Sequence, residues 1–259
     1  MKRTGLLILA GLLLVSTPAL ATMLEVGVGA WDQNVKGDLY YNLYSKPDRA
    51  DMEDDLDLED DTRGIGYLKL DLPLLPSLYL GMTPMAFDGT GMMDDPYVFG
   101  DKTFLADQPL YTDIVLNHFD VGLYYSLTIP DFGLIKKVKM DLGVNFRNAD
   151  LDVKVAGTIA TDEGEVRARE SENYTLVLPM LYGAIQITPV EKISLEFEAR
   201  GVTLSSDSLV SLMGRAKYRV HGPLFVTAGY RYDYIRLDED DLNVDCTVSG
   251  VFCETGVEF

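Results

Sequence analysis

The segment from Ile193 to Val220 alternates between apolar and polar residues with a period of two, and this pattern restricts the fold more than any other feature of the chain. One parity is apolar and consists of Ile193, Leu195, Phe197, Ala199, Val210, Leu212, Gly214, Ala216, Tyr218 and Val220. The other parity is rich in charge and consists of Ser194, Glu196, Glu198, Arg200, Ser211, Met213, Arg215, Lys217 and Arg219. The pattern predicts two antiparallel strands with one apolar and one charged face.

A polar turn at 205–208 joins these two strands. If its central residues are 206–207, antiparallel register places Glu198 opposite Arg215 and Glu196 opposite Lys217. A water-soluble β-sandwich shows the same alternation, because its apolar face meets a core and its charged face meets water. The two ends of the chain favour a membrane barrel instead.

The N-terminus has the pattern of a secretory signal peptide. Lys2 and Arg3 precede an apolar run at 5–15, and small residues at 19–21 form a cleavage site. We therefore expect residues 1–21 to be removed on export and residues 22–259 to form one mature domain. The apolar run is too short to span a bilayer as a helix. No long apolar segment follows it, so the mature chain can enter a membrane only as strands closed into a barrel.

The C-terminus alternates in the same way and ends on an aromatic residue, Phe259. A final strand that closes on a terminal aromatic resembles bacterial outer-membrane barrels, in which this end is the insertion signal. We therefore expect Phe259 to be an insertion signal that the barrel-assembly machinery reads in the C-terminal strand.

Charge and cysteine content narrow the function classes. The chain has 22 basic and 41 acidic residues and a net charge of -19, and loss of Lys2 and Arg3 makes the mature chain still more acidic. Nucleic-acid binding is therefore excluded. Cys246 and Cys253 lie near the C-terminus, and the sequence leaves open whether they form a disulfide in an oxidising periplasm or stay free.

Ten strands are predicted in an all-β, transmembrane, antiparallel up-and-down barrel. Eight of them lie at 24–31, 63–72, 77–86, 112–129, 137–147, 173–188 and in the two arms of 193–220, and the last two begin near 224 and after 245. We interpret Pro179, inside one of these strands, as the position of a bulge or bend. Tight turns near Pro73, Pro130, Pro189 and His221 alternate with connections that are mostly long and acidic, at 40–61, 87–110, 148–172 and 238–245. This layout predicts long extracellular loops and periplasmic termini.

Several short motifs resemble one known family in their order along the chain. They are 26–31 (VGVGAW), 73–76 (PLLP), 120–125 (DVGLYY), 178–182 (LPMLY), 228–231 (AGYR) and 237–242 (LDEDDL). The chain is similar to the OMP_w_GlyGly family of small outer-membrane β-barrel proteins of Gram-negative bacteria. The resemblance implies an outer-membrane location and a barrel fold, and it implies no reaction, ligand, cofactor or catalytic residue.

The predicted inward parity collects nearly equal numbers of cations and anions. The cations are Lys69, Lys139, Arg147, Arg200, Arg215, Lys217, Arg219 and Arg231. The anions are Glu25, Asp71, Asp120, Asp141, Glu196, Glu198, Asp233, Glu254 and Glu258. A balanced set can neutralise itself across a narrow interior, whereas a selective pore shows one sign in excess or two opposed stripes. The sequence therefore predicts a lumen charge network that largely fills the barrel.

Three functions follow from this architecture. The favoured one is a structural or interaction role through the extracellular loops, with outer-membrane lipid and lipopolysaccharide as partners. The second is a narrow porin-like channel for small solutes. The third is a hydrolase at the lumen rim, for which His118 and Asp120 on one strand face are the weak candidates. We expect no enzyme activity and no cofactor.

The acidic segment 48–61 offers many carboxylate oxygens for a weak contact with a divalent cation. Asp55, Asp57 and Glu59 nevertheless lack the glycine turn of an EF-hand loop. A solvated surface is therefore the favoured interpretation of this segment.

Overall fold

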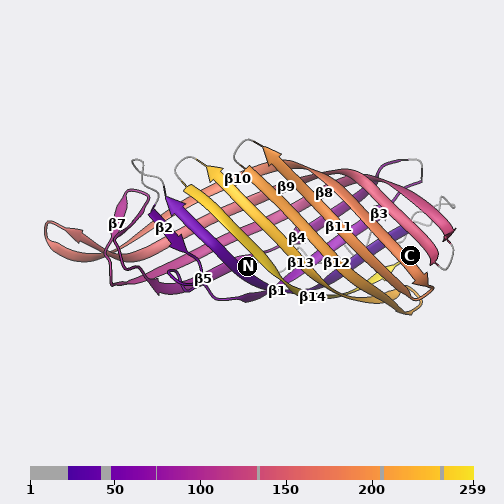
Figure 1. Cartoon of the computed structure of the whole chain (residues 1–259), viewed down its shortest axis with the longest axis horizontal. Coiled ribbons are helices and arrows are strands. Elements are labelled where there is room, and N and C mark those ends of the chain that lie inside the picture. Colours follow the sequence, from indigo (N-terminus) through magenta and orange to yellow (C-terminus); the bar gives the residue numbers. More distant parts are fainter. Residues whose placement is uncertain (1–22, 42–47, 74, 133–134, 205–206, 240–241) are drawn as a thin grey trace, which may run out of the picture.

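The structure is a computed structural model that describes residues 23–41, 48–73, 75–132, 135–204, 207–239 and 242–259 (Figure 1). Within these ranges every regular element is a β-strand, and all strand pairs are antiparallel. The described residues contain no helix that is long and apolar enough to cross a membrane. The predicted all-β antiparallel fold is therefore confirmed.

Fourteen strands follow one another along the chain. They are β1 (Met23–Tyr41), β2 (Asp48–Asp51), β3 (Asp61–Asp71), β4 (Ser77–Thr83), β5 (Ala86–Met92), β6 (Tyr97–Phe99), β7 (Lys102–Phe104), β8 (Pro109–Phe132), β9 (Ile135–Thr161), β10 (Gly164–Val190), β11 (Ile193–Leu204), β12 (Asp207–His221), β13 (Leu224–Glu239) and β14 (Leu242–Glu258).

The strands close into a ring. Its order is β1, β3, β4, β8, β9, β10, β11, β12, β13 and β14, and β14 pairs with β1 again. Strand β5 continues the position of β4 beside β8. The ring thus has ten positions, as the sequence predicts. Backbone bonds between Leu24 and Phe259, of 2.9 and 3.2 Å, complete the pairing where β14 ends.

The barrel has two unlike ends (Figure 1). The terminal end is where β1 starts and β14 ends. The loop end carries β2, β5, β6 and β7, and the β9–β10 hairpin projects beyond the other connections there.

The side chains of the ring alternate as predicted. Apolar residues point outward and are accessible, for example Leu142 at 75% and Leu181 at 74%. The charged parity points inward and is buried, for example Glu198 at 1% and Arg215 at 5%. The charged face of the 193–220 hairpin therefore lines the lumen.

The predicted register of this hairpin is wrong by two residues. Glu196 pairs with Arg215, whereas Glu198 lies opposite Met213. Asp207 belongs to β12 and pairs with Leu204, so it is not a turn residue. Ser206 lies outside the described residues. Because side chains alternate with a period of two, a shift of two residues changes the partners but keeps every side chain on its face.

The predicted loop at 148–172 is instead the outer half of the β9–β10 hairpin. Leu151, Val153 and Val155 continue the inward parity and are at most 2% exposed, while Asp152 and Lys154 point outward. The outward face of this part is polar, and the segment therefore resembles a loop in the sequence. No bulge lies at Pro179 on the side of β9, because this residue pairs in register with Phe146, but the pairing of β10 with β11 stops at Leu181.

The described part of the acidic segment 40–61, residues 40–41 and 48–61, is folded onto the barrel rather than fully solvated. Tyr40 lies within β1, and β2 pairs with that strand. Met52 and Leu56 are at most 1% exposed and pack in the same apolar cluster as the β9 side chains. Acidic residues lie between these apolar residues, and the segment therefore resembles a solvated loop in the sequence.

Two further predicted loops are strands for much of their length. The segment 87–110 contains most of β5 and all of β6 and β7, with Phe99 and Phe104 buried. The segment 238–245 contains the end of β13 and the start of β14. Both cysteines are free, and Cys246 points inward while Cys253 is exposed.

A glycine substitution tests whether the 50–58 segment is docked on β5. A Cβ atom on Gly91 would overlap the carbonyl oxygen of Asp55, whereas a Cβ on Gly66 would meet its nearest atom at 3.6 Å. We expect Gly91→Ala to detach the segment and to speed tryptic cleavage at Arg49. Gly66→Ala is the matched control. Both variants should keep the heat-modifiable gel mobility of a closed barrel, and equal cleavage rates would contradict the docking.

Candidate functional site: the filled lumen

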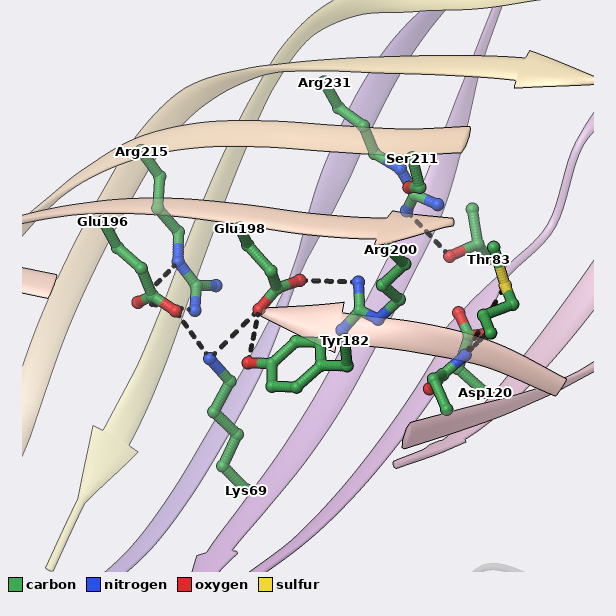
Figure 2. Close-up of polar contacts among 12 residues, drawn as sticks. Lys69, Thr83, Asp120, Tyr182, Glu196, Glu198, Arg200, Ser211, Arg215 and Arg231 are labelled. Carbon is green, nitrogen blue, oxygen red and sulfur yellow. Dashed lines mark hydrogen bonds and ion pairs between the residues drawn. The ribbon is translucent and has the colours of Figure 1, made fainter. Parts of the chain in front are cut away.

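A buried ion-pair cluster occupies the lumen nearest β11 and β12 (Figure 2). Lys69 Nζ lies 2.7 Å from Glu196 Oε1 and 3.4 Å from Glu198 Oε2. Arg215 donates to Glu196 at 2.9 Å, and Arg200 lies 2.5 Å from Glu198. One lysine from β3 thus joins two carboxylates that stand on the same face of β11.

Aromatic rings hold the cations of this cluster in place. The guanidinium of Arg200 lies over the rings of Tyr79 and Tyr182, 4.4 and 5.1 Å from their centroids. Arg215 lies 5.0 Å from the ring centroid of Tyr67. Because such contacts are stronger when the cation is desolvated, the rings help to offset the cost of burying charge.

A second group of ion pairs lies toward the terminal end. Lys217 lies 2.6 Å from Glu25 and 3.2 Å from Glu258. Arg219, which is half exposed, also contacts Glu258, at 2.8 Å. Across the lumen, Lys139 lies 2.6 Å from Asp71. All of these residues except Asp71 line a polar pocket of about 140 Å³ at this end of the lumen.

A third group crosses the middle of the barrel. Arg147 donates two bonds to Asp120, at 2.9 and 3.0 Å. Arg231 donates two bonds to Asp233, at 2.7 and 3.1 Å, and its guanidinium lies 4.6 Å from the ring centroid of Trp31. Paired two-bond contacts of this kind fix both the orientation and the neutrality of the buried groups.

All of the predicted network residues lie on the inward face, and each of them takes part in an ion pair. The structure brings together Asp120 with Arg147, Arg231 with Asp233, Lys139 with Asp141 at 3.7 Å, and Arg215 with Glu254 at 3.6 Å. No described member of the set is left as a single unneutralised charge facing the lumen.

The loop half of the lumen is filled by an apolar cluster that the sequence analysis missed. Its inward side chains are nearly inaccessible, and they include Trp31, Val35, Leu39, Met52, Leu56, Phe99, Phe104, Leu151, Val153, Val155, Leu237, Val244 and Val248. A signal was present, because the inward parity turns from charged to apolar along β9, β13 and β14.

The interior is therefore packed in two layers, one charged and one apolar. A water-filled channel would leave the side chains that line it accessible. The described inward residues of the middle and loop-end lumen are instead buried, for example Arg147 at 1%, Trp31 at 0% and Val153 at 0%. Within the described part of the chain, this packing blocks a wide path from the terminal end to the loop end.

His118 and Asp120, the weak hydrolase candidates, lie inside the middle group. His118 Nε2 is 3.0 Å from Arg231 and 3.9 Å from Asp120, and both residues are at most 5% exposed. The described residues also contain no group of three or more His, Cys, Asp or Glu residues arranged to hold a metal ion.

No protein family model matches this chain, and no curated protein sequence matches it. The solved structure of the outer membrane protease OmpT from Escherichia coli is similar, with a TM-score of 0.57 and 9% identity over 94% of this chain and 99% of that chain. The fold is that of an outer-membrane β-barrel. At 9% identity the likeness shows the fold alone.

Two other barrels match with lower scores. The attachment invasion locus protein Ail of Yersinia pestis has a TM-score of 0.32 and 8% identity, over 92% of this chain and 99% of that chain. The translocator domain of the autotransporter NalP from Neisseria meningitidis has a TM-score of 0.40 and 9% identity, over 97% of this chain and 92% of that chain.

The buried pair of Arg147 and Asp120 offers a test of the network. Removing one partner leaves a charge buried without compensation, and we expect Arg147→Met to lower the free energy of unfolding by about 3–5 kcal/mol. The double variant Arg147→Met, Asp120→Leu should recover most of this loss, because it removes both charges. Urea unfolding of protein refolded in lipid vesicles measures both effects.

The exposed pair of Arg49 and Asp38 is the control for this test. Because water already solvates Arg49, the variant Arg49→Met should change the unfolding midpoint little. A double variant as unstable as Arg147→Met alone would contradict mutual neutralisation in the lumen.

Proposed function

We propose that this protein is an integral outer-membrane β-barrel that does not conduct and that acts through its folded loop end in a structural or interaction role. The observation that carries the proposal is the two-layer filling of the lumen. Ion pairs and an apolar cluster fill the interior of this barrel, so it offers no wide route for solutes. Its outer wall and its loop end are then the surfaces that can contact other molecules.

The outward face supports the membrane location. An exposed apolar belt surrounds the ring, and it includes Val28, Met82, Leu123, Leu142, Leu181, Phe197, Val226 and Val251. Tyr230 and Tyr232 stand on the same outward face of β13, as expected for an interfacial girdle. Export by residues 1–21, which lie among the residues that the structure does not describe, is part of the same proposal.

The loop end is an ordered surface with an acidic exterior. Its cations are largely committed to neighbouring carboxylates, as in Arg49 with Asp38 at 2.6 Å and Lys36 with Glu53 at 2.8 Å. The hydrogen bond from Lys102 lowers the pKa of the Asp101 carboxyl. The remaining carboxylates favour a cationic partner or the divalent cations that bridge lipopolysaccharide.

The partners follow from location and chemistry. We infer outer-membrane lipid and lipopolysaccharide around the belt, and the barrel-assembly machinery at the C-terminal strand with Phe259. A weak divalent-cation contact at the acidic segment stays a prediction, as does membership of the OMP_w_GlyGly family.

The two alternative functions have less support. A narrow channel is favoured only by the polar pocket at the terminal end, which the charged layer closes. A hydrolase would need an accessible acid–base pair, whereas His118 and Asp120 are buried. We therefore propose a protein without enzyme activity.

Single-channel recording tests the closed lumen. We expect no discrete conductance steps from the barrel refolded in a planar bilayer, once its heat-modifiable gel mobility confirms that it has closed. A porin in the same bilayer is the positive control. Discrete openings whose ion selectivity changes in Arg219→Glu, at the terminal mouth, would contradict the proposal and support the channel.

A further inference from the structure

The ladder between β10 and β11 stops before either strand ends, and we call this place the seam. Their pairing begins at the terminal end and stops at Leu181 with Gly201, although β11 continues to Leu204 and β10 continues to Gly164. Pro179 is the second residue beyond the last pair. Because proline has no N–H to donate, it limits further pairing along this strand.

An apolar groove of about 500 Å³ lies on the outside of this seam. Its lining is mostly aliphatic and comes from four consecutive strands of the ring, β9 and β10 on one side of the seam and β11 and β12 on the other. The lining residues are Val144, Pro179, Met180, Leu181, Gly201, Val202, Thr203 and Val210. No charged side chain lines it.

The groove reaches the interior of the protein. Met180 is 2% exposed and belongs to the apolar cluster of the lumen, and Val202 packs against the same cluster. Both residues nevertheless line the groove on the outside of the wall. The seam is therefore a place where the outer apolar belt and the inner apolar cluster meet.

The absence of a side chain at Gly201 keeps the groove open. A Cβ atom at this position would meet its nearest atom, a backbone oxygen of Leu209, at 3.7 Å, which is an ordinary contact. The backbone of Gly201 also needs no left-handed conformation. A larger residue would fit without strain and would fill the groove.

We propose that the seam groove binds one acyl chain of a lipid in the loop-side leaflet, and this proposal goes beyond the role of the loop end. The neighbouring outward residues, such as Phe146 and Leu212, are apolar and place the groove in the membrane belt. Thr203, the polar residue of the lining, and its pairing partner Ser208 mark the polar limit of the groove. An acyl chain that enters from this limit meets mostly aliphatic side chains, and its polar head stays at the boundary.

The size and chemistry of the groove agree with this occupant. Small-molecule sites have volumes of about 300–1,000 Å³, and the seam groove falls inside this range. Water is excluded from the hydrocarbon layer, so an apolar hollow there is filled either by a lipid chain or by an apolar side chain of another protein. The mostly aliphatic lining, without a charged side chain, favours an acyl chain.

Photo-labelling tests the proposal with the full mature chain folded in vesicles. The probe is a phosphatidylcholine that carries a diazirine in the middle of one acyl chain. After irradiation, mass spectrometry of peptides should find label at Leu181 or Val202 at several times the level at Leu127, an outward residue outside the groove. Equal labelling at these positions would overturn the proposal.

Two glycine variants sharpen this experiment. Gly201→Leu fills the groove and should abolish the excess labelling, whereas Gly214→Leu, at an open position on the outward face of β12, should keep it. If Gly201→Leu does not give the gel mobility of a closed barrel, Val210→Phe narrows the groove from β12. Loss of labelling in both Leu variants would overturn the proposal, and so would a cross-linked dimer that only Gly201→Leu abolishes. Neither readout depends on whether the lumen conducts.

Discussion

Closure of the strand ring is the constraint on which the rest of the structure depends. In hydrocarbon a backbone N–H or C=O group has no water to bind, so a chain of strands crosses a membrane only if each strand has two neighbours. Here β14 returns to β1, and Leu24 and Phe259 exchange backbone bonds at the terminal end. Once the ring is closed, each side chain has only two environments, the outer belt or the lumen.

Closure of the ring also buries the charged side chains that point into the lumen. A buried ion pair contributes little net stability by itself, but an unpaired charge is costly. The network meets this condition by sharing partners, as when Lys69 serves both Glu196 and Glu198. Arg200 contacts the rings of Tyr79 and Tyr182 and also forms an ion pair with Glu198. Charge balance and aromatic packing together make a solid polar interior.

The sequence predicts the fold class and strand number well, because both depend on local alternation. Local alternation does not predict which charged residues pair inside the lumen. The Lys69–Glu196 bond joins residues 127 positions apart in the sequence, and the Lys217–Glu25 bond joins residues 192 positions apart. The register error has a different cause. A polar turn at 205–208 is compatible with several registers of the two strands that differ by two residues. Alternation alone does not distinguish these registers, because each of them keeps every side chain on the same face.

The sequence analysis did not predict the apolar layer because the solvent outside each strand changes along its length. Within the belt, the outward face is apolar and the inward face is charged. Beyond the belt, the outward face meets water, so β9 reverses the pattern and places Asp152 and Lys154 outside and Val153 inside. A single rule of apolar outside and polar inside therefore fails at the membrane boundary. Strands that continue beyond this boundary were predicted as loops for this reason.

The seam between β10 and β11 lies at this same boundary. Deep in the belt, an interrupted ladder would leave backbone groups in hydrocarbon. Above the belt, water would satisfy them. At the level of Pro179 and Thr203 the two environments meet, so the wall can lose its pairing while lipid chains still cover its apolar side. The position of the seam thus follows from the solvent on each side of the wall, and the groove lies on the outside of the seam.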